Sequence, residues 1–252
     1  MSLSSTKISW ADAVWNPWSG CTKVSAGCQF CYAEKIAEDK RGTLAFPRGF
    51  ELTFRPHKLD DPLKLQRPSR TFVNSTSDIF FEQVTDDEIL GVFDVMNRCY
   101  GKNKGHIFQV LTKRSKRMVE LAPSIRFTPN IWMGVSLENR RWTTRLDDLV
   151  QIPAAVRFVS AEPLLGPLGD LSKWLPHLQW MIVGGESGSH LKLHSKRWMD
   201  HAWARDIRDQ CVRHDVPFFF KQSSGFRSEQ DPYLHELDGT KTSWREFPVV
   251  RP

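Results

Sequence analysis

Three segments of similar pattern decide the fold: WMGVSLE at residues 132–138, RFVSAE at 157–162 and WMIVGGE at 180–186. Each runs from an apolar, strand-length stretch through a small residue to a glutamate, and the glutamates Glu138, Glu162 and Glu186 stand 24 residues apart. One strand, one helix and two short loops occupy about that length, so the spacing predicts consecutive βα units. The three carboxylates are then expected at one end of the sheet. A glutamate there also suits the start of the next helix, and this plainer role stays open.

Apolar stretches of strand length recur along the chain, with helix-like segments between them. This alternation predicts an α/β fold, an incomplete parallel βα barrel (TIM-like) of about six or seven strands, with the active site at the carboxyl ends of the strands. Helices with one apolar face are expected after Asp86, over 142–150 and over 203–211. The expected strands lie near residues 7–10, 71–75, 106–112, 132–136, 157–160, 180–183 and 217–221.

The chain has 252 residues, 40% of them hydrophobic and 25% charged. These values exclude a disordered, collagen-like or coiled-coil chain and allow a sizeable core. No linker rich in Gly, Ser or Pro divides the chain. We therefore expect a single domain over residues 1–252, with an irregular insertion at 40–70 and a loosely structured tail at 223–252.

Several function classes and locations are disfavoured by what the sequence lacks. It has no GxxxxGKS/T, GxGxxG, HExxH or GxSxG motif, which argues against P-loop, Rossmann, zincin and α/β-hydrolase chemistry. No apolar run approaches the roughly 18 residues needed to cross a bilayer. The first residues do not form a secretion signal, and five cysteines are too few for a secreted disulfide framework. A cytoplasmic protein without membrane contact is expected.

Three cysteines, Cys21, Cys28 and Cys31, lie in the short stretch CTKVSAGCQFC at residues 21–31. A CxxC pair brings two sulfurs to one metal centre, and a third sulfur joins them when neighbouring glycines let the loop fold back. Three ligands leave one position open, which in a [4Fe-4S] cluster is a reactive iron. The alternatives are a zinc site with His57 as fourth ligand and a set of unligated structural thiols.

Basic residues recur just after the expected strands. Lys and Arg number 35 against 29 Asp and Glu, a surplus of a size that many enzymes carry without binding nucleic acid. If the strands are neighbours, these residues form one rim that faces a phosphate backbone, and the plain alternative is that they serve solubility. The expected nucleic-acid rim consists of Arg114, Lys116, Arg117, Arg140, Arg141, Lys196 and Arg197.

Taken together, these motifs resemble the phage Gp37/Gp68-like family (DUF5131), which is in turn similar to radical S-adenosylmethionine (SAM) enzymes of the spore photoproduct lyase branch. The resemblance covers about residues 6–225 and implies a radical SAM-like barrel. Its first loop would hold the cluster through Cys21, Cys28 and Cys31, and the open iron would chelate SAM. The matching segments are WNPWSGC at 15–21, GCQFCYA at 27–33, VNSTSD at 73–78, GVS at 134–136, SAEPLL at 160–165 and GGESG at 184–188.

The resemblance also implies roles for single residues, and this chain departs from the pattern in two places. Phe30 matches the aromatic residue expected near the adenine of SAM. Gly184, Gly185 and Glu186 match in type the Gly-Gly-Glu that holds the SAM amino group, but they follow the sixth expected strand and not the second. The cysteine spacing is six then two residues where three then two is usual, so the loop must bulge. From their places at the barrel mouth, further candidates for binding SAM are Ser75, Asp78, Lys113, Ser136, Glu138 and Glu162.

The expected function is that of an enzyme, a radical SAM lyase or modifying enzyme. It would generate a 5′-deoxyadenosyl radical to modify or repair a nucleic acid or nucleotide, with an electron-donor protein as partner. One alternative is a non-catalytic zinc or iron–sulfur module that assembles with a partner protein in a phage or mobile-element system. The other is a radical SAM enzyme that acts on a small molecule or peptide, which predicts basic residues dispersed over the outer surface.

Overall fold

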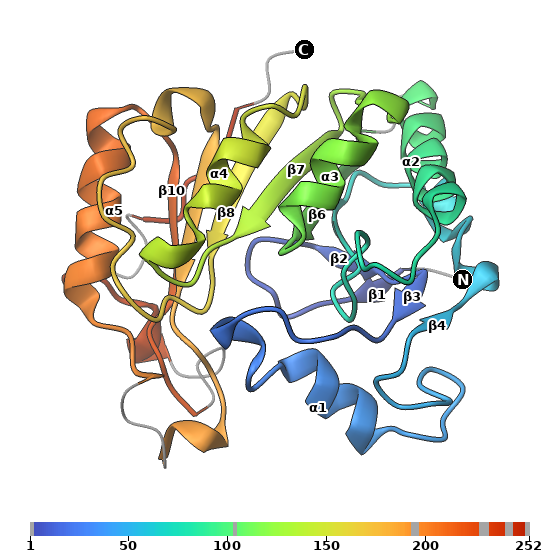
Figure 1. Cartoon of the computed structure of the whole chain (residues 1–252), viewed down its shortest axis with the longest axis horizontal. Coiled ribbons are helices and arrows are strands. Elements are labelled where there is room, and N and C mark those ends of the chain that lie inside the picture. Colours follow the sequence, from blue (N-terminus) through green and yellow to red (C-terminus); the bar gives the residue numbers. More distant parts are fainter. Residues whose placement is uncertain (1–2, 103–104, 193–196, 227–231, 240–243, 250–252) are drawn as a thin grey trace. The chain divides into compact units, whose positions relative to one another are not determined.

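The computed structural model describes residues 3–102, 105–192, 197–226, 232–239 and 244–249. The chain divides into two compact units, Met1–Met133 with Ile152–Ala155 and Gly134–Gln151 with Val156–Pro252. Both units combine helices with strands, and most strand pairs are parallel (Figure 1). The expected α/β class is confirmed.

The strands of the first unit are β1 (Ser4–Ser5), β2 (Ala13–Trp15), β3 (Trp18–Ser19), β4 (Thr53–Phe54), β5 (Arg70–Val73) and β6 (Ile107–Thr112). β2, β5 and β6 are parallel neighbours in that order. Ala13 of β2 pairs with Thr71 of β5, which pairs with Phe108 of β6, so the carboxyl ends of these strands lie side by side. β1 runs antiparallel to β2, and β3 pairs with β4 in a separate small sheet.

The expected strand at residues 7–10 is wrong, because the first parallel strand starts only at Ala13. Asp12 fixes this start. Its N–H donates to the Arg70 carbonyl at 2.8 Å, and its carboxylate accepts from the Arg70 guanidinium at 2.9 Å. The pairing partner that sets the register is far away in sequence, so an apolar pattern around residues 7–10 could not show it.

The helices of the first unit are α1 (Tyr32–Asp39), α2 (Asp86–Gly101) and α3 (Ser115–Leu121). A capping box starts α2, in which the Glu88 N–H donates to the Thr85 hydroxyl at 3.3 Å and the Thr85 N–H donates to the Glu88 carboxylate at 2.9 Å. Thr85 is therefore the N-cap, and the helix begins at Asp86, the residue after which it was expected. The expected apolar face of this helix is confirmed by the burial of Ile89, Phe93 and Met96.

The remaining elements are β7 (Ile131–Ser136), β8 (Val156–Ala161), α4 (Thr144–Leu149), β9 (Trp180–Gly184), α5 (His201–Arg213) and β10 (Phe218–Gln222). The chain passes from the first unit to the second within β7. In the second unit β8, β9 and β10 are parallel neighbours, with Phe158 opposite Trp180 and Met181 opposite Phe218. Figure 1 shows α5 beside β10. The expected strands after residue 150 are thus confirmed.

The connection from β8 to β9 lacks the helix that the 24-residue spacing predicts, and that part of the prediction is wrong. Residues 162–179 are irregular except for a single 3₁₀ turn. Pro163 and Pro167 lack the N–H that a helix needs, and Gly166 and Gly169 add backbone freedom. A similar length of chain therefore reaches the next strand without a helix.

Short 3₁₀ helices occupy several connections, and the insertion at residues 40–70 contains only β4 and two of these helices. The tail contributes to the second unit, because the Phe220 N–H donates to the Trp244 carbonyl at 2.7 Å and the Glu246 N–H donates to the Phe218 carbonyl at 3.1 Å. Among the described residues, the 3₁₀ helices with both ends in view are Ala26–Cys28, Pro56–Lys58, Asp61–Lys64, Ala122–Ser124, Arg140–Trp142, Leu175–His177, Ser189–Lys192 and Pro232–His235.

Strands β7, β9 and β10 are buried on both faces along all or most of their length, as parallel strands covered on both sides require. Every residue of β7 and of β9 is buried, and β10 begins with three buried phenylalanines. Within the described part of the chain, no helix combines the length and the apolar character needed to cross a membrane.

The close packing of β7 against Phe158 can be tested by adding a single methyl group to β7. A Cβ added at Gly134 would lie 2.6 Å from the Phe158 ring, so Gly134→Ala is expected to lower the free energy of unfolding by about 1–3 kcal/mol. At Gly91, inside α2, an added Cβ meets no atom within 4 Å. Gly91→Ala is therefore expected to raise the free energy of unfolding by about 0.5–1 kcal/mol. Urea unfolding of both variants measures the difference, and equal effects would contradict this account of the packing.

Candidate cofactor site

The three clustered cysteines lie on the loop between β3 and α1. A 3₁₀ helix at Ala26–Cys28 occupies part of the longer interval between the cysteines, from Cys21 to Cys28. Cys31 is the N-cap of α1 and has an extended backbone. The loop starts at Gly20, which has a φ of +94°. A Cβ added there would lie 2.4 Å from the Glu51 carbonyl carbon, so the position has no room for a side chain.

The thiols of this loop are partly buried, and none is in a disulfide. The Cys21 thiol donates to the Thr22 carbonyl at 3.4 Å and accepts from the Arg114 guanidinium at 3.3 Å. Burial raises the pKa of Cys21 to about 11, with a further contribution from Asp78, and burial also raises the pKa of Cys31. Both groups are therefore thiols at neutral pH, and binding iron as thiolates would release their protons.

Arg114 and Asp78 form a buried ion pair next to Cys21. The Arg114 guanidinium lies 3.3 Å from the Asp78 carboxylate, and the two side chains are only 5% and 9% exposed. Arg114 also donates to Glu82 at 2.9 Å and to the Thr22 hydroxyl at 3.0 Å. Because Arg114 follows β6, this network ties the cysteine loop to a strand end.

Asp78 connects the same network to the end of β5. Its carboxylate accepts from the Thr112 hydroxyl at 2.7 Å and from the Lys113 N–H at 3.0 Å. Thr112 is the last residue of β6, and Asp78 belongs to the loop that follows β5. Two of the residues expected to bind a cofactor, Asp78 and Lys113, are thus in direct contact.

The loop after β5 also touches the cysteine loop directly. The Gly20 N–H donates to the Thr76 carbonyl at 3.0 Å, and the Tyr32 hydroxyl donates to the Ser75 carbonyl at 2.7 Å. The Asn16 amide oxygen accepts from the Ser75 hydroxyl at 3.1 Å and from the Thr76 N–H at 3.2 Å. Ser75, expected from the sequence to bind a cofactor, therefore lies beside the cysteine loop.

Several buried polar groups of β3 and of the loop after β5 have no hydrogen-bond partner among the described residues. Native proteins rarely leave such groups without a protein, water or ligand partner, because each costs about 1–3 kcal/mol. Asn74 is the extreme case, since both amide atoms are buried and its φ of +57° is unusual for a side-chain-bearing residue. The sequence analysis missed Asn74. The other atoms are the hydroxyls of Ser19, Thr76 and Ser77 and Nε1 of Trp18.

The strand-end glutamates of the second unit each pair with a basic side chain. The fully buried Glu138 carboxylate lies 3.2 Å from Arg145, and the Glu162 carboxylate lies 2.5 Å from Lys221. Glu186 pairs with Arg197. All three follow their strands as expected, and all three have their charge balanced within the unit.

The glycines and serine expected beside these glutamates have close-packing roles. A Cβ at Gly185 would lie 2.3 Å from the Ser224 nitrogen, and one at Gly184 would lie 3.2 Å from the Glu162 side chain. Ser136 is 2% exposed, and its carbonyl accepts from Arg145 at 2.7 Å. Glycine at 185 is therefore required by the neighbouring backbone, whereas a side chain at 184 would press only on the Glu162 side chain.

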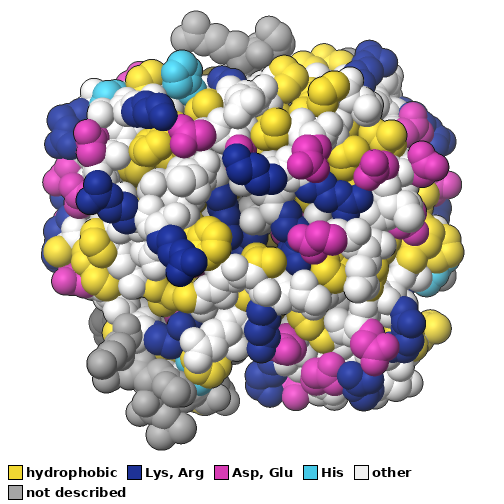
Figure 2. All heavy atoms as spheres, viewed as in Figure 1, with side chains coloured by type: hydrophobic (Ala, Val, Ile, Leu, Met, Phe, Trp, Pro, Cys, Tyr) yellow, Lys and Arg dark blue, Asp and Glu magenta, His cyan; other side chains and the backbone are white. Residues whose placement is uncertain are grey.

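The residues expected to form a basic rim differ in exposure. Arg114 is buried, Arg117 donates to the Phe81 and Val84 carbonyls, and Arg197 pairs with Glu186, so these three side chains are engaged within the protein. Lys116, Arg140 and Arg141 are exposed, while Lys196 lies outside the described residues. On the face shown in Figure 2, Lys and Arg side chains are interspersed with Asp and Glu.

No group of three His, Cys, Asp or Glu side chains in the described ranges is spaced to hold a single metal ion. His57, the expected fourth ligand of a zinc site, is exposed on the 3₁₀ helix Pro56–Lys58. An iron–sulfur cluster spaces its ligands differently, because each sulfur binds a separate iron. Phe30, next to Cys31, is half-buried.

Comparison with known proteins gives one family over nearly the whole chain. The profile described as "Protein of unknown function (DUF5131)" matches residues 5–248. The chain belongs to the DUF5131 family. The expected family is confirmed, while its phage Gp37/Gp68 label stays a prediction. None of the curated proteins compared matches the chain.

Among solved structures, this DUF5131 protein is similar in fold to spore photoproduct lyase, a radical SAM enzyme. A cysteine-to-serine variant of that lyase has 12% sequence identity and a TM-score of 0.51, over 85% of this chain and 76% of the lyase. The lyase complexed with dinucleoside spore photoproduct has 13% identity and a TM-score of 0.51, over 84% of this chain. The chain spans 64% of the length of that second structure. The expected radical SAM-like, TIM-like fold is confirmed.

The Asp78–Arg114 pair can be tested by a double-mutant cycle. Arg114→Met leaves a buried carboxylate without its cation, so it is expected to lower the free energy of unfolding by about 3 kcal/mol. Adding Asp78→Asn to it is expected to recover part of that loss, because the uncompensated charge is removed. The matched control is Arg67→Met, at an exposed position, with an expected effect within about 0.5 kcal/mol. Urea unfolding measures all variants, and additive effects at positions 78 and 114 would contradict the coupling.

Proposed function

We propose that this DUF5131 protein is a radical SAM enzyme that holds a 4Fe–4S cluster on Cys21, Cys28 and Cys31. One observation carries the proposal. In a fold shared with spore photoproduct lyase, the cysteine loop is hydrogen-bonded to a strand-end loop whose buried polar side chains lack partners among the described residues. The three thiols suit a cluster, and the buried polar atoms that lack hydrogen bonds suit a zwitterionic ligand beside it.

The cysteines have the donor chemistry that a cluster needs. Thiolates are the usual ligands of iron–sulfur clusters, and three of them leave one iron for another ligand. When bound to a reduced cluster, SAM supplies a 5′-deoxyadenosyl radical that removes a hydrogen atom from a substrate. The chain's own task is to hold the ligands in place, and Arg114 serves this task by binding both Cys21 and Thr22.

The loop after β5 suits the methionyl part of SAM. That group carries an ammonium and a carboxylate, so it needs both acceptors and donors. The Asn74 amide offers both, and the hydroxyls of Thr76 and Ser77 offer either. The Asp78 charge is already paired with Arg114, so its part is to fix this loop in place. Ser75 belongs to the same loop, and its hydroxyl donates a hydrogen bond to Asn16, which follows β2.

The other cofactor candidates are assigned by position. Phe30 is proposed to lie near the adenine and Lys113 near the ribose or methionyl group. Ser136, Glu138, Glu162, Gly184, Gly185 and Glu186 remain candidates at the strand ends of the second unit, where the ion pairs of the three glutamates make a direct charge contact with SAM less favourable.

A nucleic acid or nucleotide is the proposed substrate class. Two of the solved structures of similar fold are described as spore photoproduct lyase bound to dinucleoside spore photoproduct. Three of the residues expected to form the nucleic-acid rim, Lys116, Arg140 and Arg141, are exposed. These residues would contact phosphates, with an electron-donor protein needed to reduce the cluster.

The cluster assignment is tested by anaerobic reconstitution with iron and sulfide. The wild-type protein is expected to bind about four irons and to release 5′-deoxyadenosine when reduced with SAM present. Cys28→Ala is expected to lose both signals because one of three ligands is gone. The matched control is Cys99→Ala, buried in α2, which should change neither. Binding of one zinc ion in place of the cluster, with no SAM cleavage, would overturn the proposal.

The role of the loop after β5 is tested at Asn74. Gly accepts a φ of +57° without strain, so Asn74→Gly removes the amide and keeps the backbone. SAM affinity is expected to fall about tenfold, the loss of one or two hydrogen bonds, while iron content stays unchanged. Asp215→Gly, at an exposed position with a φ of +55°, is the control and should leave SAM affinity unaltered. Calorimetric titration of SAM into reconstituted protein measures both, and unchanged affinity in Asn74→Gly would contradict this role.

A further inference from the structure

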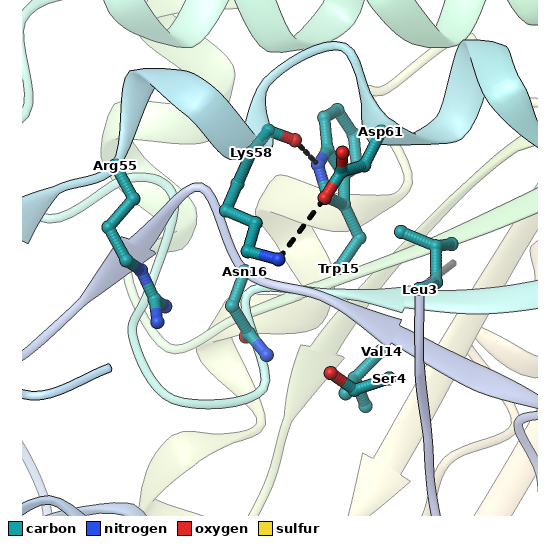
Figure 3. A pocket seen from close by; sticks show the side chains of 8 residues that line it. All are labelled: Leu3, Ser4, Val14, Trp15, Asn16, Arg55, Lys58 and Asp61. Atoms are coloured by element: carbon teal, nitrogen blue, oxygen red, sulfur yellow. Dashed lines mark hydrogen bonds and ion pairs between the residues drawn. The ribbon is translucent and has the colours of Figure 1, made fainter. Parts of the chain in front are cut away.

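The first unit contains a small cavity between β2 and the irregular insertion, and none of the cysteines lines it. Its volume is about 60 Å³, which is room for a group of a few heavy atoms. Figure 3 shows the Arg55 guanidinium, the Lys58 ammonium and the Asn16 amide on one side of it, with Leu3 and Val14 on the other. The cavity thus has a cationic side and an apolar side.

Arg55 is a partly buried cation that meets no carboxylate at ion-pair distance in the part of the chain that the structure describes. Its guanidinium donates to the Trp18 carbonyl at 3.0 Å and to the Ala45 carbonyl at 3.2 Å. The third guanidinium nitrogen, Nε, is buried and has no hydrogen-bond partner among the described residues. Burial lowers the pKa of Arg55, which means that the site disfavours the charge, although an arginine stays protonated. An anion in the cavity would relieve this cost.

Lys58 adds a second positive charge. Its ammonium lies 3.4 Å from the Asp61 carboxylate, which is 3% exposed and also binds Lys64 at 3.0 Å. One carboxylate therefore faces two lysines, and the group formed by Arg55, Lys58, Lys64 and Asp61 keeps a net positive charge. Asp61 lines the cavity as well, but its charge is more than balanced.

Asn16 supplies an oriented neutral donor. Its amide oxygen accepts from the Ser75 hydroxyl and the Thr76 N–H, so the oxygen faces the loop after β5. The amide nitrogen therefore points away from that loop, and Figure 3 shows it at the cavity. A neutral donor next to two cations matches an acceptor with several oxygens.

We propose that this cavity binds a phosphate group through Arg55, Lys58 and Asn16. Two positive charges favour a dianion over a carboxylate, and charge-assisted hydrogen bonds to phosphate oxygens are the strong ones. Leu3 and Val14 line the opposite side of the cavity. The phosphate comes either from a free ion or from a nucleotide. This site uses none of the cysteines and does not depend on the proposed radical chemistry.

Calorimetric titration of inorganic phosphate into the iron-free protein at low ionic strength tests the site. Lys58 and Lys64 both pair with Asp61, but only Lys58 lines the cavity, so they form a matched pair. Lys58→Gln is expected to weaken phosphate binding about tenfold and Lys64→Gln less than about twofold. Wild-type protein that binds no phosphate, or equal losses in the two variants, would overturn the proposal.

Arg55→Gln provides an independent check and is expected to abolish binding. Because Arg55 also holds the Trp18 and Ala45 carbonyls, its fold is verified by urea unfolding before titration. A folded variant that binds phosphate as the wild type does would contradict the proposal. Competition by a 5′-phosphorylated dinucleotide supports a nucleotide source, and binding of inorganic phosphate alone supports a free ion.

Discussion

The buried ion pair between Asp78 and Arg114 is the constraint on which the candidate site depends. Desolvated charges are tolerated only when paired and hydrogen-bonded, and here the carboxylate has Thr112 and backbone donors while the guanidinium has Glu82 and Thr22. The pair joins the loop after β5 to the end of β6 and to the cysteine loop. Three segments that are distant in sequence are thereby held in one arrangement.

This arrangement makes the cysteine loop part of the strand-end architecture. Asn16 reaches the loop after β5 through Ser75 and Thr76, and Tyr32 reaches it from α1. Hydrogen bonds from both ends of the cysteine segment therefore fix the loop after β5 without any cofactor. Preorganisation of this kind lowers the ordering cost of binding, which suits the proposed binding of an inorganic cluster and an organic ligand.

Much of the fold could be predicted from the sequence because apolar strand patterns are local. The strands from β5 to β10, the buried face of α2 and the strand-end positions of Glu138, Glu162 and Glu186 all follow from such patterns. The start of β2 could not be predicted, since it depends on the pairing of Asp12 with Arg70. The burial of Arg114 and the importance of Asn74 depend on contacts across long sequence separations, which a basic run or a single Asn does not reveal.

The tail segment beside β10 has a consequence for the behaviour of the chain. β10 ends the parallel set of the second unit and begins with Phe218, Phe219 and Phe220, a composition that favours pairing with foreign strands. Trp244 and Glu246 occupy backbone groups of that edge. The segment around residues 244–246 therefore covers part of the β10 edge and protects it from aggregation. A fragment that stops before residue 244 would leave these backbone groups of β10 open to pairing with strands of other molecules.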